Sequence, residues 1–111
     1  MKLMIHKNND QGCFWEVYQN GNFFEFTQST NTALNGWKID IFNNDIITTR
    51  TNFGSTFSFE TSSKYKYYKI KSTETGKYLQ IDLNKKRDNN SYFITLVSDK
   101  KIASDFMLKF S

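Results

Sequence analysis

The fold is decided by residues 65–111, which open with Tyr65-Lys66-Tyr67-Tyr68-Lys69-Ile70-Lys71. A polar turn over residues 72–76 separates this run from a second one, Lys77-Tyr78-Leu79-Gln80-Ile81-Asp82-Leu83. Apolar and polar side chains alternate in the second run, as they do in half-buried β-strands. A basic loop over residues 85–90 then leads to a third apolar run, residues 92–97. The pattern predicts consecutive antiparallel strands.

The alternation also assigns side chains to the two faces of these strands. Tyr68 and Ile70 mark the core side of the first strand. On the second strand we expect Leu79, Ile81 and Leu83 to be buried. The residues expected to point outward are Tyr65, Tyr67, Lys69 and Lys71 on the first strand and Tyr78, Gln80 and Asp82 on the second.

The preceding part of the chain shows the same succession of strand-like runs and tight turns. Asn20-Gly21-Asn22 separates the alternating residues 13–18 from the aromatic residues 23–27, and Asn-Gly turns are typical of hairpins. Further strands are predicted over residues 37–42, 46–51 and 55–60. The whole chain, residues 1–111, is therefore expected to be one mainly β domain, a small antiparallel barrel or sandwich built of consecutive hairpins.

The last segment fits two structures. Ile102, Phe106 and Phe110 recur every four residues, which would place them on one face of a helix. Phe106, Leu108 and Phe110 also alternate as they would in a strand. We favour a strand over residues 105–110 and keep one C-terminal helix over residues 99–110 as the alternative.

Composition favours a folded protein with its own core. Eleven Phe, six Tyr and two Trp among 111 residues supply the apolar area that a single core needs. The single cysteine, Cys13, cannot form an internal disulfide, which fits a reducing compartment. The apolar run near Met1 is too short for a signal peptide, and no stretch reaches the roughly 20 apolar residues of a membrane span. We expect a cytoplasmic protein, with a mature secreted form as the alternative.

Positive charge is concentrated in the second half of the chain. Residues 1–63 carry four basic and six acidic side chains, whereas residues 64–111 carry eleven basic and five acidic ones. Such asymmetry suggests a polyanionic partner, although a solvated lysine surface would give the same composition.

The residues that usually carry catalysis or bind metal are scarce. The chain holds one histidine, His6, and Cys13, whereas a structural metal site needs three or four ligands. Glu25 and Asp40 could face each other on neighbouring strands, but surface carboxylates are far commoner than acid–base pairs. No glycine-rich phosphate loop or nucleophile elbow is present in the sequence. We expect a protein that is not an enzyme and has no cofactor and no metal.

Aromatic and basic residues are interleaved on the predicted outer face. Proteins bind single-stranded nucleic acid by stacking bases on aromatic rings, at ~1–3 kcal/mol per base, within a positively charged groove. The alternative is that these tyrosines cover a second packed layer. The candidate nucleic-acid-binding residues are Tyr65, Tyr67, Lys69, Lys71, Lys77, Tyr78, Lys85, Lys86 and Arg87.

Three stretches share one pattern of apolar strand, polar turn, glycine and alternating strand. They begin near residues 4, 23 and 67, and their glycines are Gly12, Gly36 and Gly76. The glycines are unevenly spaced, so the pattern indicates repeated hairpins rather than a solenoid.

Residues 65–110 resemble two families. One is the purine-rich-element-binding (PUR) repeat, which is related in architecture to whirly-type single-strand binders. The likeness lies in the paired aromatics Tyr67-Tyr68, the run Gly76-Lys77-Tyr78-Leu79, the basic loop and the final amphipathic segment. This resemblance implies single-stranded nucleic acid bound on the sheet, by a homodimer or by paired repeats.

The other family is the β-trefoil group of ricin-type lectins and fascin-like modules. The likeness lies in Tyr68-x-Ile70, the run Gly76-Lys77-Tyr78-Leu79 and the ending Phe106-x-Leu108. It implies a module that binds carbohydrate or protein, with three pseudo-symmetric hairpin units and outward aromatics in separate places. The small size and the Asn- and Lys-rich composition also fit a third function, a small phage or mobile-element inhibitor that binds a host defence protein or a toxin.

Overall fold

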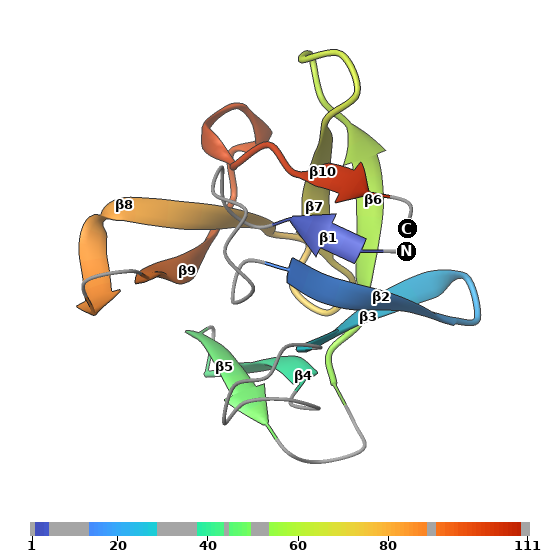
Figure 1. Ribbon diagram of the computed structural model, residues 1–111, viewed down its shortest axis with the longest axis horizontal. Coiled ribbons are helices and arrows are strands. Elements are labelled where there is room, and N and C mark those ends of the chain that lie inside the picture. The colour runs from blue at the N-terminus through green and yellow to red at the C-terminus, as the bar shows by residue number, and fades with distance from the viewer. Residues whose placement is uncertain are drawn as a thin grey trace.

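Antiparallel strands make up nearly all of the regular structure (Figure 1). The computed structural model describes residues 2–4, 14–28, 38–43, 45–49, 54–88 and 91–109. These ranges contain no α-helix, only a 3-10 turn, η2 (Lys100–Ile102). The strands are β1 (Lys2–Met4), β2 (Phe14–Asn20), β3 (Phe23–Gln28), β4 (Lys38–Phe42), β5 (Asp45–Thr49), β6 (Phe57–Thr61), β7 (Tyr68–Ser72), β8 (Tyr78–Asp88), β9 (Ser91–Val97) and β10 (Met107–Lys109).

Six of the described strands form a closed ring. β10, β1, β2, β3, β6 and β7 are hydrogen-bonded neighbours in that order, all antiparallel. The ring closes where Tyr68 and Phe106 exchange two backbone hydrogen bonds, each 2.8 Å long, just before β10 begins. Closure pairs strands that would otherwise have open edges. The expected fold class, mainly β with a small antiparallel barrel or sandwich made of hairpins, is confirmed, and the ring is a barrel.

Two successive four-strand units repeat the same arrangement. In the first unit, β3 to β6, the outer strands pair at Phe24 and Phe57 and enclose the β4–β5 hairpin. In the second unit, β7 to β10, Tyr68 and Phe106 form the corresponding bridge and enclose the β8–β9 hairpin. Each hairpin is joined to the first strand of its unit by one residue pair at the equivalent position. These pairs are Thr27 with Lys38 and Lys71 with Tyr78. The second and third copies of the sequence pattern coincide with these units.

A serine holds each hairpin to its unit in the same way. The Ser55 N–H donates to the Ile39 carbonyl over 3.1 Å, and its Oγ accepts from the Ile41 N–H over 3.0 Å. The Ser104 N–H likewise donates to the Leu79 carbonyl over 3.1 Å, and its Oγ accepts from the Ile81 N–H over 2.7 Å. Each serine therefore satisfies backbone groups next to the core, where an unpaired group would be costly.

The core fills the ring and the space beneath the hairpins. Its aromatic centre is Phe26, which packs against Phe57 and Phe59 with ring centroids 5.1 and 5.9 Å apart. Phe57 is buried and Phe59 packs against the same core, so these two residues of β6 share a face. The buried members are Val17, Phe26, Ile39, Phe57, Ile70, Leu79 and Phe106.

The barrel has two distinct ends. Because successive ring strands are antiparallel, the β2–β3 and β6–β7 turns lie at the same end as the start of β1 and the finish of β10. We call this the turn end. The β4–β5 and β8–β9 hairpins project from the opposite, hairpin end, toward the lower left of Figure 1. The β2–β3 turn is tight because Gly21 adopts a φ of +64°, which glycine takes without strain.

Two local expectations are corrected, and the choice left open for the last segment is decided. β7 begins at Tyr68 rather than Tyr65, because residues 62–67 form the β6–β7 turn. The basic loop expected from Lys85 is strand as far as Asp88, since β8 continues through it. A C-terminal helix is absent over residues 99–109, where η2 and β10 stand instead, and the strand that we favoured is confirmed at Met107–Lys109.

Candidate interaction surface

The outer face of β6, β7 and β8 is the face on which nucleic acid was expected to bind. Glu60 pairs with Lys69 and Lys71 pairs with Tyr78 across these strands, so their side chains share one face. This face is crossed by residues 98–105, which we call the strap. Lys71 and Lys77 are half-buried, and Lys85, Lys86 and Arg87 lie in β8 with side chains outside the described part of the structure.

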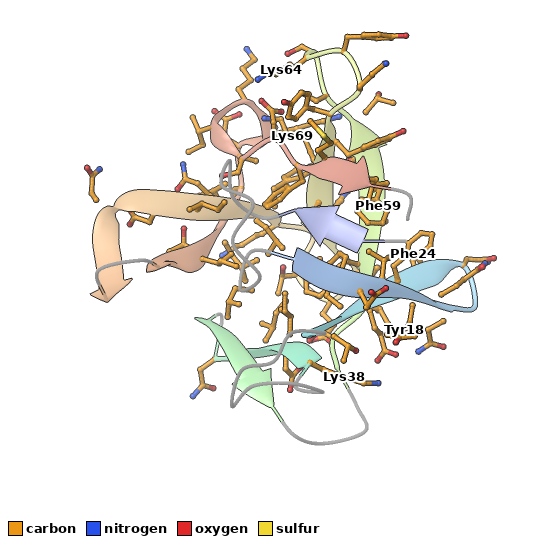
Figure 2. The ribbon with its side chains drawn as sticks, viewed as in Figure 1. Tyr18, Phe24, Lys38, Phe59, Lys64 and Lys69 are labelled. Carbon is orange, nitrogen blue, oxygen red and sulfur yellow. The ribbon has the colours of Figure 1, made fainter. Side chains whose placement is uncertain are left out.

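Lys69 is buried beneath the strap, so the prediction that it faces solvent is wrong. Its side chain is 9% exposed, its Nζ lies 3.0 Å from Asp105 Oδ1, and it donates to the Ala103 carbonyl. Figure 2 shows Lys69 inside the molecule and Lys64 in the turn beyond it. A buried ammonium needs such partners because an unpaired charge is very costly away from water. Lys69 therefore attaches the strap to the barrel.

The Asp105 carboxylate joins the strap to the β6–β7 turn. It accepts a hydrogen bond from Ser62 Oγ and pairs with Lys69. Burial raises the pKa of Asp105, but the hydrogen bonds from Ser62 and Lys69 outweigh that effect, so its pKa lies below the ordinary value. The ionised form is thus the one that the fold uses.

Tyr78 is also covered, at 8% exposure, which corrects its expected outward position. Its hydroxyl donates to both oxygens of Glu60, over 3.0 and 2.8 Å. This hydrogen bond holds the pKa of Glu60 below its ordinary value and raises the pKa of Tyr78. Lys100 of the strap lies 3.4 Å from Glu60, and Lys71 Nζ lies 5.8 Å from the Tyr78 ring centroid. Neither face of this ring is presented as an open stacking platform.

Three large exposed hydrophobic side chains lie in or beside the two turns of the turn end. Four such residues stand out among the described residues: Tyr18 at 55% exposure, Phe23 at 43%, Tyr65 at 85% and Ile102 at 55%. Tyr18 and Phe23 flank the β2–β3 turn, and Tyr65 lies in the β6–β7 turn. Ile102 belongs to the strap instead. Figure 2 shows Tyr18 on the β2–β3 hairpin.

Aromatic packing connects the two turns. The Phe24 ring lies 5.1 Å from Phe59, and the Phe59 ring lies 6.1 Å from Tyr68. These three half-buried rings span β3, β6 and β7 close to the turn end. A continuous row of packed rings therefore runs from β3 through β6 to β7, near the two turns.

The Tyr18 and Phe23 positions were not predicted as a site. The sequence shows them as ordinary members of a hairpin, and the only signal was the outward phase of Tyr18 in the alternation of residues 13–18. Two elements remote in sequence, the β2–β3 and β6–β7 turns, lie at the same end because β3 pairs with β6 and successive strands are antiparallel.

Glu25 and Asp40, considered above as a carboxylate pair, each have other partners. Glu25 lies 3.6 Å from Lys38 and accepts a hydrogen bond from the Gly54 N–H, whereas Asp40 accepts from Ser55 Oγ over 2.6 Å. Among the described residues, no three His, Cys, Asp or Glu side chains group as a metal site would require. His6 and Cys13 lie outside the described residues.

No protein-family model matches the sequence, and neither does any curated protein. No helix in the described part of the chain combines the length and apolar character that crossing a membrane demands. The function is therefore inferred from the geometry of the chain itself.

Proposed function

We propose that this chain is a non-enzymatic binding module of the β-trefoil type that recognises a protein partner through the turn end of its barrel. Two four-strand units support the β-trefoil architecture. They share the order of their strands, the positions of their bridges and the hydrogen bonds made by Ser55 and Ser104. β1 and β2 occupy the places of the outer strands in a third unit. A ring of paired strands with one hairpin per unit is the arrangement that the β-trefoil resemblance implies.

The observation that carries the binding function is the exposure of Tyr18, Phe23 and Tyr65 in or beside the two turns of one barrel end. Exposed hydrophobic side chains scattered singly need no explanation, but a group of aromatics on a rigid base is typical of interaction sites. Tyrosine is also enriched among the residues that dominate binding energy at protein interfaces. The turn end is therefore the surface best suited to a partner.

The single-strand-binding hypothesis has weaker support on this geometry. Lys69 and Tyr78 take part in attaching the strap, so they are covered. Of the three tyrosines proposed to bind nucleic acid, only Tyr65 and Tyr67 lie outside the covered face. A groove that follows phosphates needs a row of accessible cations beside stacking rings. A protein partner needs only a compact group of anchors. An inhibitor that binds a host defence protein or a toxin would be one module of this kind.

The test is a capture experiment with matched surface variants. Immobilised protein is exposed to lysate of its source cells as wild type, as the triple variant Tyr18→Ala, Phe23→Ala and Tyr65→Ala, and as Ile102→Ala. The last variant removes an exposed hydrophobic side chain that belongs to the strap and to neither turn. We expect one protein to be retained in stoichiometric amount by the wild type and Ile102→Ala and to be lost with the triple variant, while circular dichroism confirms that all three fold.

A nucleic-acid titration decides between the two functions. A labelled single strand of about 20 nucleotides is titrated with the wild type at low and high salt, because counterion release makes genuine phosphate binding salt-dependent. We expect no salt-dependent binding. Such binding, reduced by Tyr67→Ala, together with unchanged protein capture by the triple variant, would overturn the proposal in favour of nucleic acid.

A further inference from the structure

The β6–β7 turn is held in one conformation by hydrogen bonds at its base and its tip. The Ser62 N–H donates to the Tyr67 carbonyl, and the Tyr67 N–H donates to the Lys64 carbonyl, both over 3.1 Å. The Lys64 N–H donates to Ser62 Oγ over 3.0 Å, and that hydroxyl in turn donates to Asp105 of the strap. The turn is thereby fastened to the barrel rather than free to adapt.

One residue of the turn adopts a disfavoured backbone conformation. Lys66 has a φ of +69°, in the left-handed region that non-glycine residues seldom occupy. Such strain persists when surrounding contacts determine the conformation, and it is often found at sites that present side chains for binding. Here it accompanies the most exposed aromatic side chain of the described residues, Tyr65 at 85% exposure.

Lysine ammonium groups accompany both tyrosine rings of the turn. Lys64 Nζ lies 4.2 Å from the centroid of the Tyr67 ring, and Lys66 Nζ lies 5.6 Å from that of Tyr65. Cation–π attraction at these distances restrains flexible side chains that would otherwise lose more entropy on binding. The turn thus presents two positive charges and two phenol rings in a pre-organised group.

From this geometry we infer that the turn, residues 62–67, recognises a carboxylate-rich peptide segment of the partner. This inference rests on the proposed function and names the chemistry of the partner at one part of the turn end. Carboxylates would pair with Lys64 and Lys66, and apolar side chains between them would pack on Tyr65. Because lysines already approach both rings, the turn suits alternating acidic and apolar groups better than stacked bases.

The probe is a short fluorescein-labelled peptide of alternating glutamate and leucine, with a lysine–leucine peptide as the charge-reversed control. Anisotropy is measured for the wild type, for Lys64→Ala with Lys66→Ala, for Tyr65→Ala and for Lys101→Ala, which removes an exposed lysine outside the turn. We expect salt-dependent binding of the acidic peptide only. The double lysine variant should weaken it about tenfold, Tyr65→Ala should weaken it by a similar factor, and Lys101→Ala should leave it within about twofold.

Three results would overturn the inference. The first is that the acidic peptide does not bind the wild type. The second is that Lys101→Ala weakens peptide binding as much as the double lysine variant does. The third is that an oligonucleotide binds more tightly than the peptide and depends on the variants in the same way. The proposed function can survive the first two of these, because capture of a partner through Tyr18 and Phe23 does not need the lysines of the turn. It fails separately if the triple variant retains the partner.

Discussion

Replacing Lys69 by methionine separates its structural role from a role in binding. The substitution keeps the length of the side chain and removes the ion pair with Asp105 and the hydrogen bond to the Ala103 carbonyl. Losing one member of a fully buried ion pair costs about 3–5 kcal/mol. The Asp105 side chain is 33% exposed, so its unpaired charge stays partly hydrated. We therefore expect a loss of about 2–3 kcal/mol in the free energy of unfolding.

Thermal unfolding followed by circular dichroism measures this loss. For a domain of this size we expect the melting temperature to fall by about 10 °C in Lys69→Met. Lys101→Met, a change at an exposed position, should alter it by no more than about 2 °C. A double-mutant cycle with Asp105→Asn should give a coupling energy of about 1–2 kcal/mol, because each residue is the partner of the other. If Lys69→Met unfolds at the wild-type temperature, the strap is not attached as we describe.

The remaining predictions concern the hairpins, one close contact and acid stability. Ser104→Ala should cost about 1–2 kcal/mol in urea unfolding, because it removes the side-chain acceptor of the Ile81 N–H next to the core. Ser55→Ala should cost less, because the Ile41 N–H keeps Asp40 Oδ1 as an acceptor at 2.8 Å; an equal or larger cost at Ser55 would contradict this reasoning. Gly54→Ala should destabilise by about 1–3 kcal/mol, since a Cβ there would lie 3.1 Å from a β4 carbonyl; an unchanged urea midpoint would show that β4 can move aside. Glu60 and Asp105 have pKa values in the folded state below their ordinary values of 4.5 and 3.8. Their ionised forms therefore stabilise the fold fully above the ordinary values, and this stabilisation is lost as the pH falls through the folded-state pKa values. The melting temperature should accordingly fall on acidification below about pH 4.5. The Asp105 part of that fall should be smaller in Lys69→Met, where Ser62 still donates to Asp105; an identical acid profile for that variant would refute the assignment.

Much of the fold follows from local patterns. Alternation placed Ile70 and Leu79 correctly in the core, and Asn20-Gly21-Asn22 correctly marked a tight turn. These features depend on the period of a strand and on the freedom of glycine at positive φ, both of which act within a few residues. The internal pattern predicted repeated hairpins, and hairpins are present among the described strands.

The candidate site could be predicted only in part. Tyr65 was expected to be exposed and is, whereas Lys69 and Tyr78 were expected on an open face and are covered. Alternation tells which face of a strand a side chain occupies, but it carries no information about a distant segment that later covers that face. Lys69 reaches the Ala103 carbonyl across 34 positions of the chain, and no local pattern reports such a contact.

By itself, the sequence determined that this chain forms consecutive antiparallel hairpins with an aromatic core, because strand period and turn chemistry are local. Only the tertiary structure decided which aromatic and basic side chains remain available for a partner. Pairing Phe106 with Tyr68 places the strap over β6 to β8, and pairing β3 with β6 puts the turns that carry Tyr18 and Tyr65 at the same end of the barrel. Exposure is a property of the closed barrel, so it depends on contacts between residues far apart in the chain.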